Sequence, residues 1–317
     1  MGYCIIPERT AVILPLSSFA PLREIKDFQG GRSLLFYHFL EHLMSPTPFT
    51  NQMILITGGS MGIGLATAEE IARLGGSVCL IARRPDPLAA AAQRVRAAAA
   101  SPEQIVETLA CDTTDEAALQ PLLEDFIARR GAPDRLINTV GYAYPQRVGK
   151  LTLADFRKQM AINYFGQLIP TQLLLPHWLQ QGRGHVAFVS SVLGFMSLTG
   201  YAAYAPTKYA LFGLAETLRH ELKPRGIVVS VLFPPDTDTP GFEHENLSKP
   251  PETAKLSETA NLMTPEAVAR AFVAGLGKNR FEILPGEARW IRLLSRLAPG
   301  AMRWYLDREL KKLKIKK

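Results

Sequence analysis

The amino-acid sequence predicts an α/β fold: a doubly wound parallel sheet of about seven strands, followed by a C-terminal amphipathic helical tail. From about residue 52, short apolar runs alternate with helical patterns. The runs are almost continuously apolar, which is typical of parallel strands that helices cover on both faces. A glycine-rich turn joins the first run to the first helical pattern. Sheets of this kind bind their ligands at the carboxyl ends of the strands.

The predicted strands and helices alternate in the order of a Rossmann-type fold. The strands are MILIT at 53–57, SVCLIA at 77–82, IVETLACD at 105–112, RLINTVG at 135–141, HVAFVSS at 185–191, IVVSVLFPP at 227–235 and FEILP at 281–285. Helical patterns separate them at 65–75, near 88–100, and at 115–130, 153–181, 201–223 and 264–277. The last pattern opens with Thr-Pro-Glu, a helix-start signal. The long polar segment from 234 to about 261 is predicted to be a lid or binding loop.

These patterns divide the chain into an N-terminal extension (1–51), a sheet domain (52–286) and a basic tail (287–317). The extension has neither clear periodicity nor a motif, so we expect it to be poorly ordered. It lacks a basic segment before its apolar stretch, which argues against a secretory signal. The sequence has no apolar run of the roughly 18 residues that a membrane-spanning helix needs.

Cysteine usage favours a reducing compartment. The three cysteines, Cys4, Cys79 and Cys111, are an odd number and lack metal-ligand spacing. Cys79 and Cys111 lie in apolar runs, so we expect buried, reduced thiols. The sequence therefore predicts a cytoplasmic protein without a metal site.

The net charge of +7 is concentrated in the tail. Residues 287–317 hold ten Lys or Arg and three Asp or Glu, and the rest of the chain has 26 of each sign. A neutral domain with one basic segment argues against a nucleic-acid-binding domain and favours a local patch for an anionic surface.

The tail also carries two apolar stripes at helical spacing. The first consists of Trp290, Ile291, Leu294, Leu297 and Ala298, with arginines 289, 292 and 296 off the stripe, and the second of Met302, Leu306, Leu310 and Leu313. Pro299 and Gly300 separate them. This pattern fits an amphipathic helix lying in a membrane interface, at the cytoplasmic face. It fits equally a helix that packs on the domain or on a second subunit, and we expect a homo-oligomer.

The first strand is followed by the pattern G-x-x-x-G-x-G, formed by Gly58, Gly62 and Gly64. Glycines at such a turn let the backbone approach a pyrophosphate, which then lies at the N-terminus of the following helix. The strand–turn–helix context makes this a specific signal for a dinucleotide.

The residues after the second strand favour NADP over NAD. An acidic residue is usual there when a free ribose 2′-hydroxyl is bound, whereas this chain has Arg83 and Arg84. An arginine can bind the 2′-phosphate of NADP with charge-assisted hydrogen bonds. Asp112, at the end of the third strand, is placed to accept a hydrogen bond from the adenine amino group. The alternatives are solvated arginines in a loop and a helix-capping or turn aspartate.

The segment YAAYAPTKYA at 201–210 contains a candidate proton donor. Reduction of a ketone leaves an alkoxide that needs a proton, and a tyrosine hydroxyl with a pKa of about 10 is a poor partner at neutral pH. A neighbouring ammonium would lower that pKa. Tyr204 and Lys208 are four residues apart and share a helix face. Tyr209 points elsewhere, and Tyr201 lies on the same face but out of reach.

A third group is needed to bind the carbonyl oxygen. Ser191 ends the fifth predicted strand, where this fold binds its ligand, and Ser190 is expected to point to the other side of the strand. A Tyr-x-x-x-Lys pair alone is common on helix surfaces, but the strand-end serine and the glycine-rich turn make a chance match improbable.

These motifs resemble those of the short-chain dehydrogenase/reductase family. The similar segments are TGGSMGIG, CDTTD, NTVG, INYFG, VSS and YAPTK, within residues 52–245. The resemblance implies that Ser191 polarises the carbonyl, that Tyr204 donates the proton, and that Lys208 holds the ribose hydroxyls and lowers the tyrosine pKa. Asn163 would anchor a water in the proton relay. NTVG departs from the usual Asn-Asn-Ala-Gly but keeps Asn138 and Gly141.

Together, the motifs and the resemblance predict an NADPH site. Its predicted residues are Gly58, Ser60, Met61, Gly62, Ile63, Gly64, Arg83, Arg84, Asp112, Asn138, Gly141, Tyr204, Lys208 and Thr239.

A narrower resemblance points to one group within the family, the 3-ketodihydrosphingosine reductases. It rests on FPPDTDTPGFEHEN at 233–246, on GGSMG, ARR and GLAETLRHELKPRGI, and on KPPETAKLSE. It implies that Thr239 contacts the nicotinamide carboxamide and that a long-chain sphingoid base is reduced at its 3-keto group. The alternatives are reduction of another apolar ketone, such as a 3-oxoacyl thioester or a steroid, and a non-catalytic NADP sensor or scaffold. A sensor would need no proton donor.

Overall fold

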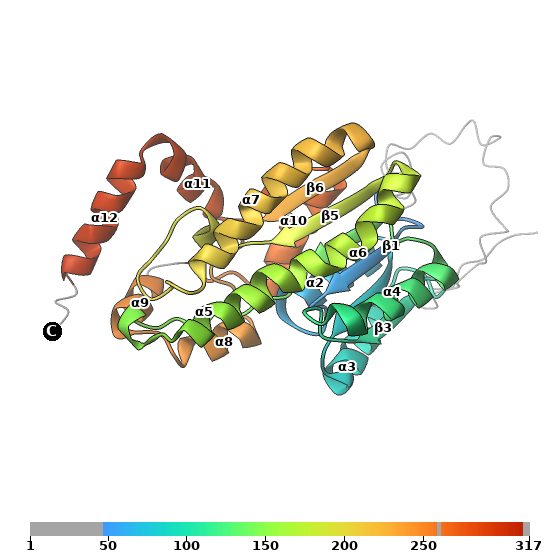
Figure 1. Cartoon of the computed structure of the whole chain (residues 1–317), viewed down its shortest axis with the longest axis horizontal. Helices are drawn as coiled ribbons and strands as arrows, with labels where there is room; N and C mark the ends of the chain where they lie inside the picture. Colours follow the sequence, from blue (N-terminus) through green and yellow to red (C-terminus); the bar gives the residue numbers. More distant parts are fainter. Residues whose placement is uncertain (1–46, 259–260, 313–317) are drawn as a thin grey trace, which may run out of the picture. The chain divides into compact units, whose positions relative to one another are not determined.

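The computed structural model describes residues 47–258 and 261–312 (Figure 1). The predictions for residues 1–46, including Cys4, and for Leu313 fall outside this range. Thr47–Thr50 form a turn next to the first strand. Phe49 is buried there, with the Arg135 guanidinium 4.9 Å from its ring centre. Residues just before the predicted start of the sheet domain therefore contribute to its core.

Seven parallel strands form one sheet, in the order β3-β2-β1-β4-β5-β6-β7. Their bounds are β1 Met53–Thr57, β2 Ser77–Ala82, β3 Val106–Ala110, β4 Arg135–Asn138, β5 Gly184–Val189, β6 Ile227–Leu232 and β7 Glu282–Ile283. All seven predicted strands are confirmed. The strand order reverses between β1 and β4, and this switch point opens a crevice at the carboxyl ends of the strands.

Helices cover both faces of the sheet (Figure 1). α2 (Gly62–Arg73), α3 (Pro85–Ala98) and α10 (Pro265–Gly277) pack on one face, and α4 (Glu116–Arg130), α6 (Gly166–Gln181) and α7 (Ala205–Leu222) on the other. Side chains along β1 alternate between the two cores: Ile54 and Ile56 join the first and Leu55 the second. This alternation is why the strands are apolar at every position.

The predicted helix at 153–181 is interrupted. α5 (Leu153–Met160) and α6 flank a π-helical turn, η4 (Ala161–Phe165). Such turns insert an extra residue and often occur at functional sites.

The helix predicted to begin at 201 begins at Ala205. The residues before it form a turn, in which the N–H of Ala205 donates to the carbonyl of Tyr201 at 2.9 Å. Pro206 then lies in the first helical turn, where its missing N–H costs nothing.

The predicted lid is not a simple loop. It contains two short helices, α8 (Pro240–Asn246) and α9 (Pro251–Ser257). Both have a proline in the first turn, and the Thr239 hydroxyl caps α8 by accepting from the N–H of Phe242 at 3.1 Å. Short 3₁₀ turns lie at η3 (Val148–Lys150), η5 (Val192–Gly194) and η6 (Lys223–Arg225).

The tail forms α11 (Ala288–Leu297) and α12 (Pro299–Lys312). Arg292, predicted to flank the apolar stripe, instead docks α11 on the domain. Its guanidinium makes an ion pair with Glu282 at 2.9 Å and stacks on the rings of Phe195 and Phe212, 5.2 and 4.8 Å from their centres. The tail is therefore attached to the domain by an arginine.

Candidate active site

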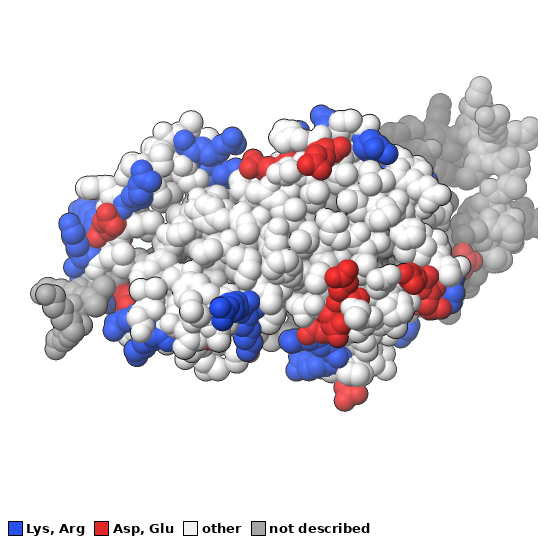
Figure 2. Space-filling model, in the orientation of Figure 1, with Lys and Arg blue, Asp and Glu red and all other residues white. Residues whose placement is uncertain are grey.

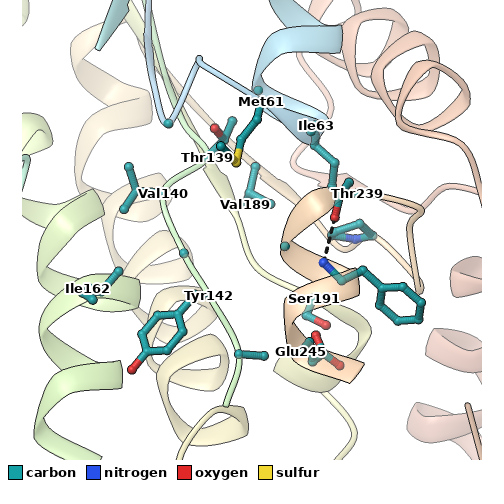
Figure 3. Close-up of a pocket in the computed structure, with 18 of the residues that line it drawn as sticks. Met61, Ile63, Thr139, Val140, Tyr142, Ile162, Val189, Ser191, Thr239 and Glu245 are labelled. Carbon is teal, nitrogen blue, oxygen red and sulfur yellow. Dashed lines mark hydrogen bonds between the residues drawn. The ribbon is translucent and has the colours of Figure 1, made fainter. Parts of the chain in front are cut away.

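A cavity of about 560 Å³ lies at the carboxyl ends of the strands, where ligands bind in this fold (Figure 3). The glycine-rich turn, with Met61 and Ile63, forms one end, and Ser191 and Glu245 lie at the other (Figure 3). The loop after β4 and the π-helical turn η4 contribute Val140, Tyr142 and Ile162 to the wall. The cavity is long enough to bring the turn and the predicted catalytic residues into one site.

The glycine-rich turn requires its glycines for two separate reasons. Gly58 and Gly62 have φ angles of +72° and +54°, a region that glycine adopts without strain. At Gly64, an added Cβ would lie 2.5 Å from the carbonyl oxygen of Gly58 and from the Thr139 hydroxyl. The turn therefore packs closely against the loop after β4. It presents the N-terminus of α2 to the cavity, as an anion site needs.

Most of the predicted cofactor residues line this cavity. They are Gly58, Ser60, Met61, Gly62, Ile63, Gly64, Arg83, Arg84, Asp112, Gly141, Tyr204, Lys208 and Thr239. Asn138 does not, so its predicted direct contact with a cofactor has no support in the geometry. Its buried carboxamide accepts from Thr57 and donates to Thr171, both at 3.1 Å. Asn138 thus ties β4 to β1 and α6.

Arg83 and Asp112 lie side by side in the wall of the cavity. A guanidinium nitrogen of Arg83 is 3.7 Å from Asp112 Oδ2, and the arginine side chain is 66% exposed. Asp112 Oδ1 accepts from the N–H and the hydroxyl of Thr114 at 3.0 and 2.8 Å. The cap of α4 is Asp115 rather than Asp112. Asp112 therefore does not cap α4, and its predicted contact with the adenine amino group stays a prediction. The Arg83 guanidinium remains open to solvent.

Ser191, Tyr204 and Lys208 meet in the cavity. The side chains of Ser191 and Tyr204 are hydrogen-bonded, and the Lys208 ammonium lies 5.5 Å from the Tyr204 ring centre. That ammonium donates to the carbonyl of Val189 at 3.0 Å. The hydroxyl of the neighbouring Ser190 instead donates to the carbonyl of Lys208 at 2.9 Å. Tyr209 is exposed, also as predicted.

Burial dominates the ionisation of this group. It lowers the pKa of Lys208 to about 7, so at neutral pH the Lys208 amine is protonated in only part of the molecules. It also raises the pKa of Tyr204, and the Glu245 charge acts in the same direction, while the hydrogen bond with Ser191 acts against both. Desolvation therefore has the largest effect on the Tyr204 pKa in this arrangement, and the lowering expected from Lys208 stays a prediction.

Asn163 is fully buried in the π-helical turn η4 and binds protein groups. Its oxygen accepts from the N–H of Tyr142 at 2.8 Å, and its nitrogen donates to the carbonyl of Tyr142 and to the Thr207 hydroxyl at 3.0 and 3.1 Å. These bonds tie the loop after β4 to α7, close to Lys208. The predicted role as a water anchor remains a prediction.

Sequence reasoning missed the acidic group beside Ser191. The hydroxyl of Tyr201 donates to Glu245 Oε1 at 2.5 Å, and the Lys249 ammonium lies 3.1 Å from the same oxygen. Tyr201 therefore binds a residue of α8 and not Lys208. The four-residue spacing of Glu245 and Lys249 was the available signal, but nothing in the sequence indicated that the pair faces the catalytic residues.

The chain is similar to known proteins of one family. A family model described as short chain dehydrogenase matches residues 52–249. The chain belongs to the short-chain dehydrogenase family. As a member of that family it is an oxidoreductase with a nicotinamide-cofactor fold.

Among curated proteins, the chain is 36% identical to a 3-dehydrosphinganine reductase of Danio rerio over 78% of this chain and 76% of that protein. It is 35% identical to a 3-ketodihydrosphingosine reductase of Bos taurus over the same shares. A Dictyostelium discoideum 3-ketodihydrosphingosine reductase is 34% identical over 80% of both chains.

Solved structures agree with the fold. Levodione reductase superposes with a TM-score of 0.66 at 27% identity, covering 72% of this chain and 91% of its own. A short-chain dehydrogenase from Sphingobium yanoikuyae, in complex with NADPH, gives the same score and identity over 80% and 95%.

Proposed function

We propose that this oxidoreductase reduces the 3-keto group of a long-chain sphingoid base with NADPH, converting 3-ketosphinganine to sphinganine. The observation that carries the proposal is the meeting of Ser191, Tyr204 and Lys208 in one cavity, in a chain whose relatives bear the name of this reaction. A sensor or scaffold would need only the cofactor turn.

In this proposal each side chain has a separate task. NADPH supplies the hydride. Ser191 holds the carbonyl oxygen through its hydroxyl. Tyr204 would give that oxygen a proton, and Lys208 would hold the ribose hydroxyls of the bound cofactor. Asn163 keeps the loop after β4 in register with Lys208 through its three hydrogen bonds.

The choice of NADPH rests on Arg83. The described residues around it offer the guanidinium one carboxylate, Asp112, at 3.7 Å, which leaves it able to bind a phosphate. The NADPH complex of the Sphingobium yanoikuyae relative is consistent with this choice.

We further propose that the protein acts at the cytoplasmic face of a membrane, through its tail. Within residues 47–258 and 261–312, no helix has the length and hydropathy needed to cross a bilayer. α11 and α12 instead expose six large apolar residues: Trp290, Leu293, Leu294, Leu297, Trp304 and Tyr305. Basic side chains gather over the same helices (Figure 2). Such a surface suits the headgroup region of an anionic bilayer, where a long-chain substrate resides.

The second predicted apolar stripe, on α12, differs from the first in its exposure to solvent. Met302 is buried and Leu306 and Leu310 are partly buried, so this stripe is less exposed than the side chains named above. Only the outer face of the two helices supports the membrane proposal.

A substrate panel tests the proposed reaction. NADPH oxidation is measured with 3-ketosphinganine, a 3-oxoacyl thioester and a steroid ketone, at equal concentrations in the same detergent. We expect the highest kcat/KM for 3-ketosphinganine. A higher value for either other ketone would overturn the assignment of substrate while keeping the reaction type.

A further inference from the structure

Glu245 lies in the wall of the cavity beside the residues that would hold the ketone. It comes from the last turn of α8, and Figure 3 draws it next to Ser191. Its negative charge raises the pKa of Tyr204. The Tyr201 hydroxyl binds Glu245, and the Tyr201 ring is 5.9 Å from the Tyr204 ring, centre to centre. A substrate carbonyl bound by Ser191 and Tyr204 would therefore lie in the part of the cavity that carries this carboxylate.

One oxygen of Glu245 is held and the other is available. Tyr201 and Lys249 both bind Oε1, at 2.5 and 3.1 Å. Within the described part of the chain, Oε2 accepts no hydrogen bond. A carboxylate can accept several hydrogen bonds, so a ligand with a donor can still bind here. The partners on Oε1 fix the orientation of the group, which is what a recognition site needs.

The charges around Glu245 do not balance. Asp236 also lines the cavity, and the two carboxylates face one ammonium, Lys249, whose side chain is only 2% exposed. Lys158, Lys208 and His244, which precedes Glu245 in α8, also line the cavity. If Lys208 serves the cofactor, the group of Asp236, Glu245 and Lys249 keeps one excess negative charge. Partly desolvated charge of this kind is costly unless a cation binds it.

We propose that Glu245 binds the protonated amino group on the carbon next to the ketone, and so makes the site selective for 2-amino ketones. This inference rests on the proposed function and deepens it. A sphingoid 3-ketone carries its ammonium on the carbon bonded to the carbonyl carbon. A 3-oxoacyl thioester and a steroid ketone have no cation there. They would leave the excess negative charge beside Glu245 without a further cation, which selects against them.

The test compares 3-ketosphinganine with its deaminated analogue, the same long-chain 3-ketone with hydrogen in place of the amino group. A hydrogen bond to a charged group is worth about 1.5–3 kcal/mol, so we expect the wild-type enzyme to prefer the amino ketone by roughly 10- to 100-fold in kcat/KM. In Glu245→Gln this preference should fall to within about threefold, because the amide removes the charge-assisted part of that bond.

Glu243→Gln is the matched control. Glu243 lies on the same helix, is exposed, and does not line the cavity, so the variant should keep the wild-type preference. Because Glu245→Gln leaves Lys249 without its partner, a second variant combines it with Lys249→Met. NADPH binding, followed by fluorescence, reports whether each variant is folded. The double variant should lose the preference in the same way.

The outcomes separate this inference from the proposed function. If the wild-type enzyme reduces both ketones with equal kcat/KM, the ammonium site is wrong and the sphingoid assignment still stands. If it reduces neither, the proposed function fails. A folded Glu245→Gln variant that keeps the full preference would overturn the role of Glu245.

Discussion

The Lys208 ammonium lies 5.5 Å from the centre of the Tyr204 ring, one helical turn along α7, and is almost completely buried. The two groups share one desolvated site, in which burial raises the pKa of Tyr204 and lowers the pKa of Lys208. The arrangement assigns the proton to Tyr204 and leaves Lys208 to hold its position through the carbonyl of Val189.

Removing the Tyr204 hydroxyl tests the proton donor. Tyr204→Phe should lower kcat by about 10²- to 10⁴-fold, the usual contribution of general acid catalysis, while the Kd for NADPH stays close to the wild-type value. Tyr201→Phe is the control. It should act mainly on the KM for the amino ketone, because Tyr201 binds Glu245. Near-normal turnover in Tyr204→Phe together with an inactive Tyr201→Phe would refute the assignment.

The preference for NADPH tests Arg83. Arg83→Ala should weaken NADPH binding by roughly 10- to 100-fold and NADH binding much less, because only NADPH carries the 2′-phosphate. Arg94→Ala is a suitable control, since Arg94 pairs with Glu69 and does not line the cavity. Calorimetric titration of both cofactors measures the difference. Equal losses for the two cofactors would mean that Arg83 does not meet the phosphate.

The stability of the ligand-free protein should depend on Lys208 and pH. The folded-state pKa is about 7, below the ordinary value of 10.5, so below pH 7 both states carry the proton and the folded state bears the full cost of burying it. Between pH 7 and 10.5 the unfolded state binds more protons, so the free energy of unfolding rises with pH. Lys208→Met should therefore abolish turnover yet stabilise the protein at pH 6 by at least about 1 kcal/mol.

This gain should shrink as the pH approaches 10. Chemical denaturation at pH 6, 8 and 10 measures it, with the exposed Lys150→Met as control. A gain that is independent of pH would show that the ammonium is not the cause.

The outer face of the tail should bind anionic bilayers. In flotation with vesicles that contain phosphatidylserine, the wild-type protein should rise with the lipid, and high salt should release only part of it, since screening removes the charge contribution alone. Trp290→Ser with Leu297→Ser should reduce binding, because both side chains are more than half exposed and their apolar area is lost. Activity on a short, soluble ketone should stay close to the wild-type value.

Deletion of residues 288–317 is a less clean test, because it also removes Arg292, which pairs with Glu282 on β7. If the wild-type protein does not float, the exposed face of α11 and α12 serves another purpose.

The sequence was sufficient for the features that depend on local patterns. Buried parallel strands have no solvent face, so their apolar runs were visible directly. Ser191 at a strand end and the Tyr204–Lys208 pair at helical spacing could be placed in one site because the fold brings strand ends and that helix together.

Features that depend on tertiary packing could not be predicted. The π-helical turn at 161–165 adds one residue without changing the hydropathy pattern, and only its bonds to Tyr142 and Thr207 show its effect on Asn163. Asn138 was assigned to the cofactor, whereas its carboxamide is satisfied inside the sheet. Arg292 points inward because its guanidinium stacks on Phe195 and Phe212, which come from distant segments of the chain.

The central claim is tested most directly by following the hydride. The enzyme is mixed with 3-ketosphinganine and NADPH that is deuterated at the transferred position of the nicotinamide, and the product is analysed by mass spectrometry. The account predicts sphinganine with one deuterium on carbon 3, formed by the wild-type enzyme and formed about 10²- to 10⁴-fold more slowly by Tyr204→Phe. If wild-type enzyme that binds NADPH leaves 3-ketosphinganine unlabelled and unreduced, the proposed function is contradicted.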